Sequence, residues 1–159
     1  MKKTLIAALM LCSGSAFAAS WDSHNGTINN GSLLIDADSI AEANGATKVW
    51  TIFSPLVDYG RPSAGYAYNM TLRNINCGAK TVSYVKTIYY DADQVPHEAA
   101  VSDKSFQDII PDSENDVLWN YVCKPNTRND LVTRVTKVPE YLRGQAKLTK
   151  QQEQMNAKK

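Results

Sequence analysis

The chain has 159 residues, 43% of them hydrophobic, and a formal net charge of +1 at neutral pH. This length suits one domain with a sizeable core, and the balanced charge gives no electrostatic basis for binding nucleic acid. Beyond an apolar run near the amino terminus, no segment is long and apolar enough to cross a membrane. We therefore expect a single folded domain without a membrane span and without nucleic acid as a partner.

The first eighteen residues have the parts of a bacterial secretory signal. Lys2 and Lys3 form a basic start, an uncharged apolar run follows, and Ala16 and Ala18 are the small residues that signal peptidase requires. Cleavage is expected after Ala18, which leaves 141 of the 159 residues and, without the two lysines, a net charge of −1. We expect an exported protein, either periplasmic or at the cell surface.

Cys12 lies within the apolar run and raises the alternative of lipoprotein processing. Lipoproteins are cut directly before a cysteine that follows a small residue, whereas the bulky Leu11 precedes this one. We therefore do not expect a lipid anchor, and Cys12 would be removed with the signal.

Two cysteines, Cys77 and Cys123, remain in the mature chain. In an oxidising compartment, such a pair most simply forms one disulfide, which would close a loop of nearly fifty residues. A redox-active pair is the alternative, but the long spacing does not resemble Cys-x-x-Cys. The prediction is a structural bridge.

The first half of the mature chain predicts a loop, two strands and a second loop. Residues 21–31 are polar and turn-rich, which indicates an arm or loop. Residues 32–36 and 47–53 predict strands, with a turn or short helical piece at 38–42 between them. Two prolines and two glycines within 54–65 predict a long loop.

Residues 66–77 and 81–90 predict an antiparallel hairpin. In its first strand the apolar positions change parity between Leu72 and Ile75. A one-residue bulge near Arg73 would keep both halves facing one core.

A helix is predicted after a further short strand within 95–101. Pro111 precedes Asp112 or Ser113 as the N-cap, and acidic residues occupy the first turn, where the helix dipole favours negative charge. Pro125 follows the end of the helix.

The fold class follows from the two cysteines. Cys77 ends a strand and Cys123 ends the helix, so their bridge would attach the helix to the sheet. We predict an α+β domain at 19–130, with an antiparallel sheet of about five to six strands and one helix packed on a face. Residues 131–159 are a C-terminal extension, expected to be partly helical or disordered, with one last strand at 131–135.

The sequence contains no complete catalytic or metal-binding pattern. His24 and His97 are the only histidines, and their spacing does not favour a metal site. Asp36, Asp38 and Glu42 resemble part of a calcium loop, but a third oxygen ligand and a glycine are missing. We predict that the protein is not an enzyme and has no cofactor and no metal.

Tyrosines gather around the predicted hairpin. Because tyrosine combines rigid apolar area with one polar group, these side chains either fill the sheet or form a binding surface. The loop that carries Tyr59 and Arg61 and ends at Tyr66 is the candidate partner-binding site. The tyrosines concerned are Tyr59, Tyr66, Tyr68, Tyr84, Tyr89 and Tyr90.

The order and spacing of several short segments over about residues 31–124 resemble the surface-adhesin protein E family of Gram-negative bacteria. The segments are Leu34-Ile35-Asp36 with Ser39-Ile40, Lys48-Val49-Trp50, Asn76-Cys77, Phe106 to Pro111 with Asp112-Ser113, and Val122-Cys123. The resemblance implies one antiparallel-sheet domain with a helix tied to it by the Cys77–Cys123 disulfide. It also implies a non-enzymatic protein that binds host matrix glycoproteins such as laminin and vitronectin.

Two functions are consistent with these observations. The first is an adhesin that binds a protein partner of this kind. The alternative is a periplasmic inhibitor or immunity-type protein that blocks a cell-envelope enzyme, because such proteins are also small, exported, disulfide-tied and free of catalytic motifs.

Overall fold

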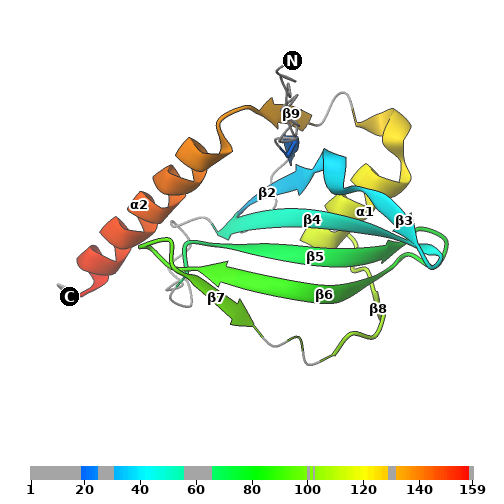
Figure 1. Ribbon diagram of the computed structural model, residues 1–159, viewed down its shortest axis with the longest axis horizontal. Coiled ribbons are helices and arrows are strands. Elements are labelled where there is room, and N and C mark those ends of the chain that lie inside the picture. Colours follow the sequence, from blue (N-terminus) through cyan, green and yellow to red (C-terminus); the bar gives the residue numbers. More distant parts are fainter. Residues whose placement is uncertain are drawn as a thin grey trace, which may run out of the picture.

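The protein forms one antiparallel sheet with a helix packed against each face (Figure 1). The computed structural model describes residues 19–24, 31–55, 66–99, 101, 103–128 and 132–157. Helix α1 (Glu114–Cys123) covers one face, and the first turns of helix α2 (Val138–Asn156) contact the other. The predicted signal with its cleavage site, and Cys12, lie outside the described residues.

The described residues form a nine-stranded sheet, with the order β7-β6-β5-β4-β2-β1-β9 and with β3 paired to β4 and β8 to β6. The α+β class and the antiparallel sheet are confirmed, and the sheet is larger than the expected five to six strands. The strands are β1 (Trp21–His24), β2 (Gly31–Asp36), β3 (Ala41–Ala43), β4 (Ala46–Pro55), β5 (Tyr68–Asn76), β6 (Thr81–Tyr90), β7 (Pro96–Ala99), β8 (Gln107–Asp108) and β9 (Val132–Val135).

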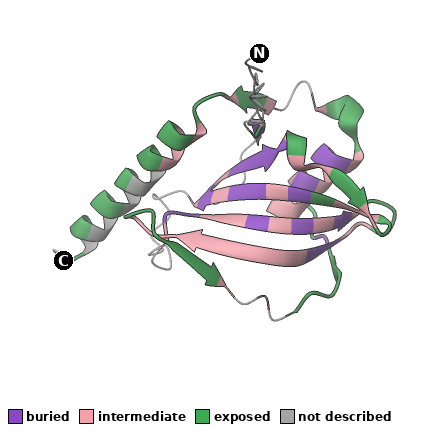
Figure 2. Cartoon of the chain, viewed as in Figure 1, coloured by how far each residue is buried: buried purple, intermediate pink, exposed green. Residues whose placement is uncertain are grey.

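Apolar side chains on both faces of the central strands explain why both faces are covered. Leu33 and Ile35 of β2 pack toward α1, while Leu34 between them packs on the opposite side with α2. Burial is strongest on β2, β4 and β5 and weaker on β6 (Figure 2). The β6 side of the sheet is therefore the less covered one.

Strand β1 corrects the expected arm or loop at 21–31, because Trp21–His24 pair with both β2 and β9. The polar sequence is compatible with a buried strand because the Asp22 carboxylate is hydrogen-bonded within the protein. Its carboxylate accepts hydrogen bonds from the Tyr121 hydroxyl (2.6 Å) and from Nε of Arg134 (2.6 Å). Residues 25–30 lie outside the described part of the chain.

The prediction of a bulge near Arg73 was wrong for β5, because the extra residue lies on the partner strand β6. The register shifts between Leu72 and Arg73, opposite Lys86 and Tyr84, so Val85 of β6 is the inserted residue. Strand β5 therefore alternates without interruption, and Leu72 and Ile75 face different layers.

The carboxyl-terminal residues add an edge strand, β9, to the sheet and then form helix α2. Val132–Val135 confirm the predicted last strand, and α2 continues to Asn156. Tyr141 and Leu142 pack against the second core, and Lys150 forms an ion pair with Asp93 (2.6 Å) near the β6–β7 turn.

Candidate functional site

A polar groove lies on the same face of β5 and β6 as α1, over the part of that face that the helix does not cover. It has a volume of about 400 Å³ and is built on polar side chains that cross-strand pairing places on one face. Strand β7, the segment after it and the start of α1 form its walls. The lining residues are Asn69, Thr71, Arg73, Tyr84, Thr87, Tyr89, Ala99, Val101, Asp103, Gln107 and Glu114.

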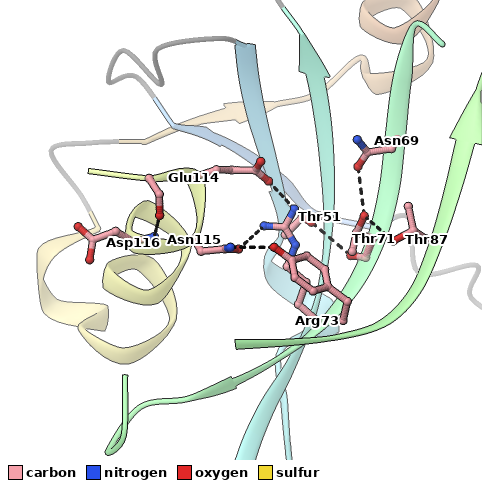
Figure 3. A network of polar contacts seen from close by, with 10 residues as sticks. Thr51, Asn69, Thr71, Arg73, Thr87, Glu114, Asn115 and Asp116 are labelled. Atoms are coloured by element: carbon pink, nitrogen blue, oxygen red, sulfur yellow. Dashed lines mark hydrogen bonds and ion pairs between the residues drawn. The ribbon is translucent and has the colours of Figure 1, made fainter. Parts of the chain in front are cut away.

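Arg73 is the charged centre of this groove and is only 4% exposed. Its guanidinium forms an ion pair with Glu114, and Nη1 donates a hydrogen bond to Oδ1 of Asn115 (2.9 Å), as Figure 3 shows. The guanidinium also lies 5.5 Å from the centre of the Tyr84 ring. Nε of Arg73 is buried and has no hydrogen-bond partner among the described residues.

Hydrogen-bonded threonines fix the floor of the groove (Figure 3). The Thr71 hydroxyl donates to Oδ1 of Asn69 (3.1 Å) and lies 3.3 Å from the Thr87 hydroxyl, and Thr51 donates to the Thr71 carbonyl (3.2 Å). These contacts restrict the rotamers of side chains that would otherwise be free on a sheet surface.

Acidic groups outnumber basic ones in the groove. Arg73 is matched by Glu114, and Asp103 adds a second carboxylate. The Ser105 hydroxyl and backbone N–H lower the pKa of Asp103, so this carboxylate is ionised at neutral pH. The groove therefore carries a small negative charge.

A contact between two tyrosines links the groove to Tyr66, where the predicted binding loop ends. The ring centres of Tyr66 and Tyr89 are 4.5 Å apart, and Tyr89 lines the groove. Burial raises the pKa of the Tyr66 phenol, and the neighbouring Tyr89 adds to this effect. Tyr59 and Arg61 lie outside the described residues, so of this predicted site only Tyr66 is placed by the structure.

The predicted Cys77–Cys123 disulfide is confirmed, with the two Cα atoms 5.5 Å apart. It joins the residue after β5 to the last residue of α1. Trp119 of α1 packs nearby, and its indole N–H donates to the Cys77 carbonyl (3.3 Å). This bridge and the Arg73 contacts fix the helix that forms one wall of the groove.

Two of the residues considered for catalysis or metal binding, His97 and Asp36, have local structural partners. His97 is paired with Asp91 (3.0 Å), and the Asp36 carboxylate accepts from the backbone N–H of Asp38 (3.1 Å). Burial raises the pKa of Asp36. Within the described residues, no three histidine, cysteine or acidic side chains are grouped as metal ligands would be.

The groove was not predicted from the sequence. Its signal is the alternation of the polar Asn69, Thr71 and Arg73 with the apolar Tyr68, Met70 and Leu72 along one strand. Polar residues at every second position of an interior strand indicate a face that no apolar layer covers.

One family model and two solved structures are similar to this chain. The family model described as Surface-adhesin protein E matches residues 21–124. Crystal form II of Haemophilus influenzae protein E is 18% identical, with 58% of this chain and 80% of that chain covered and a TM-score of 0.45. Protein E from non-typeable Haemophilus influenzae is 16% identical, with 77% and 86% covered and a TM-score of 0.44.

No curated protein sequence matches this chain. Among the described residues, neither helix has the length and apolar character that crossing a membrane would require.

Proposed function

This chain belongs to the surface-adhesin protein E family, and on that premise we propose that it is an exported adhesin that binds host extracellular-matrix glycoproteins such as laminin and vitronectin. The observation that carries the proposal is the extent of the family match. Residues 21–124 span β1 to the end of α1, which is the whole disulfide-tied unit of sheet and helix. The family is one of adhesins, which are binding proteins and not enzymes.

Export would rely on the signal at residues 1–18, with cleavage after Ala18 and no lipid anchor. The domain at 19–130 would make the contacts, and residues 131–159 would form an extension that supports it. This arrangement agrees with the pairing of β9 on β1 and the packing of α2 on the second core.

The loop that carries Tyr59 and Arg61 is the proposed contact segment, together with Tyr66. Tyr66 lies beside Tyr89, which lines the polar groove, so a macromolecule held at Tyr66 would also lie close to the groove. Tyrosine and arginine are the residue types that most often contribute strongly to protein interfaces.

The test is binding of the oxidised mature protein to immobilised laminin and vitronectin, with Arg61→Ala as the site variant. Arg143→Ala is the matched control, because Arg143 is an exposed arginine on α2 far along the chain from the loop. We expect saturable binding that Arg61→Ala weakens and Arg143→Ala does not.

Protease treatment of intact cells supplies the second arm. If the protein is an adhesin on the outer surface, the protease should degrade it. Protection of the protein, with no saturable matrix binding at micromolar concentration, would overturn the proposal and favour an inhibitor inside the envelope.

A further inference from the structure

We propose that the polar groove on β5 and β6 is a binding site for a neutral saccharide, such as the glycan of a host glycoprotein. The inference deepens the proposed function, on which it rests, by naming the part of a glycoprotein that this face would contact.

The side chains around the groove offer the mixture of donors and acceptors that neighbouring sugar hydroxyls require. Asn69 and Gln107 each carry an amide, which both donates and accepts, and Thr87 carries a hydroxyl that does the same. Asp103 is ionised and provides acceptors only. A hydroxyl-rich ligand can use the donors and acceptors that these groups keep beside their internal hydrogen bonds, whereas an apolar ligand would only shield them from water.

Aromatic rings at two positions provide the apolar contact that a sugar ring also needs. Tyr89 lies at one end against Tyr66, and Tyr84 lies beside Arg73. Both tyrosines line the groove, together with Ala99 and Val101. The flat face of a phenol ring suits the C–H side of a pyranose.

The charge of the groove selects against anionic ligands. The only cation of its lining, Arg73, is already paired with Glu114, and Asp103 remains as an uncompensated carboxylate within the described lining. A sulfated, phosphorylated or sialylated group would therefore meet like charge and no free cation. A neutral saccharide avoids this repulsion.

The groove is organised before any ligand arrives. Thr71 is held by Asn69 and Thr87, and the guanidinium of Arg73 is held by Glu114 and Asn115. Binding would then cost little side-chain entropy. Its volume of about 400 Å³ falls in the range of roughly 300–1,000 Å³ that is usual for ligand sites.

The experiment titrates the isotope-labelled, oxidised mature protein with a free asialo biantennary N-glycan and records amide chemical shifts. The same glycan with its sialic acids intact is the charged comparison. We expect saturable shifts at Thr87, Tyr89 and Gln107 with the neutral glycan, and weaker binding of the sialylated one. An absence of groove shifts at millimolar glycan would overturn the proposal.

Two variants locate the site. Thr87→Val removes one hydroxyl at nearly constant shape, and Gln107→Ala removes an exposed amide that the core does not need. Each should weaken binding roughly five-fold, as the loss of one hydrogen bond implies. Thr81→Val, on the same strand but on the opposite face, is the matched control and should bind normally. Equal affinity of all three variants would also overturn the proposal.

Matrix proteins with and without enzymatic removal of their N-glycans separate this proposal from the proposed function. Loss of adhesion to the deglycosylated proteins supports both. Unchanged adhesion together with no response to the free glycan overturns the saccharide site and leaves the adhesin. Glycan binding without adhesion to either matrix protein supports the site and overturns the assigned host partners.

Discussion

Arg73 on β5 and Cys77, which directly follows that strand, hold opposite ends of helix α1. Arg73 pairs with Glu114, the first residue of the helix, and Cys77 is bonded to Cys123, the last. A helix of ten residues is marginal alone, so these two attachments and the buried Leu118 keep it on the sheet. The two attachments can be tested separately.

Replacing both bridge cysteines, Cys77→Ser and Cys123→Ser, should lower stability without unfolding the helix at room temperature. The bridge spans 46 residues, and the chain-entropy model gives such a loop roughly 4 kcal/mol. We expect the melting temperature to fall by on the order of 10 °C, with helical circular dichroism retained below the transition. Coincident melts of the oxidised and reduced wild type would show that packing alone holds the helix.

Glu114→Gln should reduce the free energy of unfolding by about 1–3 kcal/mol, because it leaves the buried guanidinium of Arg73 without its carboxylate. Urea unfolding measures the change. The control is Glu140→Gln, which breaks an exposed pair with Arg143 and should have no measurable effect. The double variant Arg73→Met with Glu114→Gln removes the unpaired charge and should be more stable than Glu114→Gln alone. If it is not, the unpaired charge of Arg73 does not cause the loss of stability.

Stability should fall in alkaline solution because of buried tyrosines. Burial, followed by the nearby Tyr90, raises the pKa of Tyr68 from 10.0 to about 12. The folded state therefore holds this proton more tightly than the unfolded state, and the resulting stability is complete below pH 10 and lost as the pH rises toward about 12. Urea unfolding of wild type and Tyr68→Phe across this range should show a shallower decline in the variant. Parallel curves would assign the decline to other groups.

Ending the chain after residue 130 should destabilise the sheet, although the family match ends at 124. The truncation removes β9 from the edge of β1 and removes Tyr141 and Leu142 from the core that contains Trp21. We expect the free energy of unfolding to fall by more than about 2 kcal/mol, measured in urea by tryptophan fluorescence. A chain ending after residue 144 keeps those contacts and should lose less. Equal stability of the two truncated proteins would contradict this account.

The hairpin and α1 could be predicted because local patterns determine them. The turn after Cys77 and the Ser113 N-cap, whose hydroxyl accepts from the N–H of Asp116 (3.2 Å), both depend on neighbouring residues. Strand β1 could not be predicted, because its buried carboxylate, Asp22, is hydrogen-bonded by Tyr121 and Arg134, about a hundred positions away. Such contacts leave no local periodicity in a sequence.

The two-faced sheet explains the remaining differences. If the sheet had a core on one face only, the change of parity on β5 would require a bulge in that strand. Because the sheet has a core on each face, Leu72 and Ile75 belong to different layers and no bulge in β5 is needed. Val85 of β6 provides the inserted residue instead. The groove was missed for a related reason, since its polar residues lie on the part of the face that neither helix covers.

The covalent bond and the proposed contact loop lie at opposite ends of β5. The strand has nine residues, so roughly 30 Å separates Tyr66 before it from Cys77 after it. Reduction of the disulfide would leave the Tyr66 end of β5 in place, because hydrogen bonds to β4 and β6 hold the strand between them. If the proposed contact loop binds the partner, changes in the chain that joins β4 to β5 would accordingly alter binding while the disulfide that secures α1 stays in place.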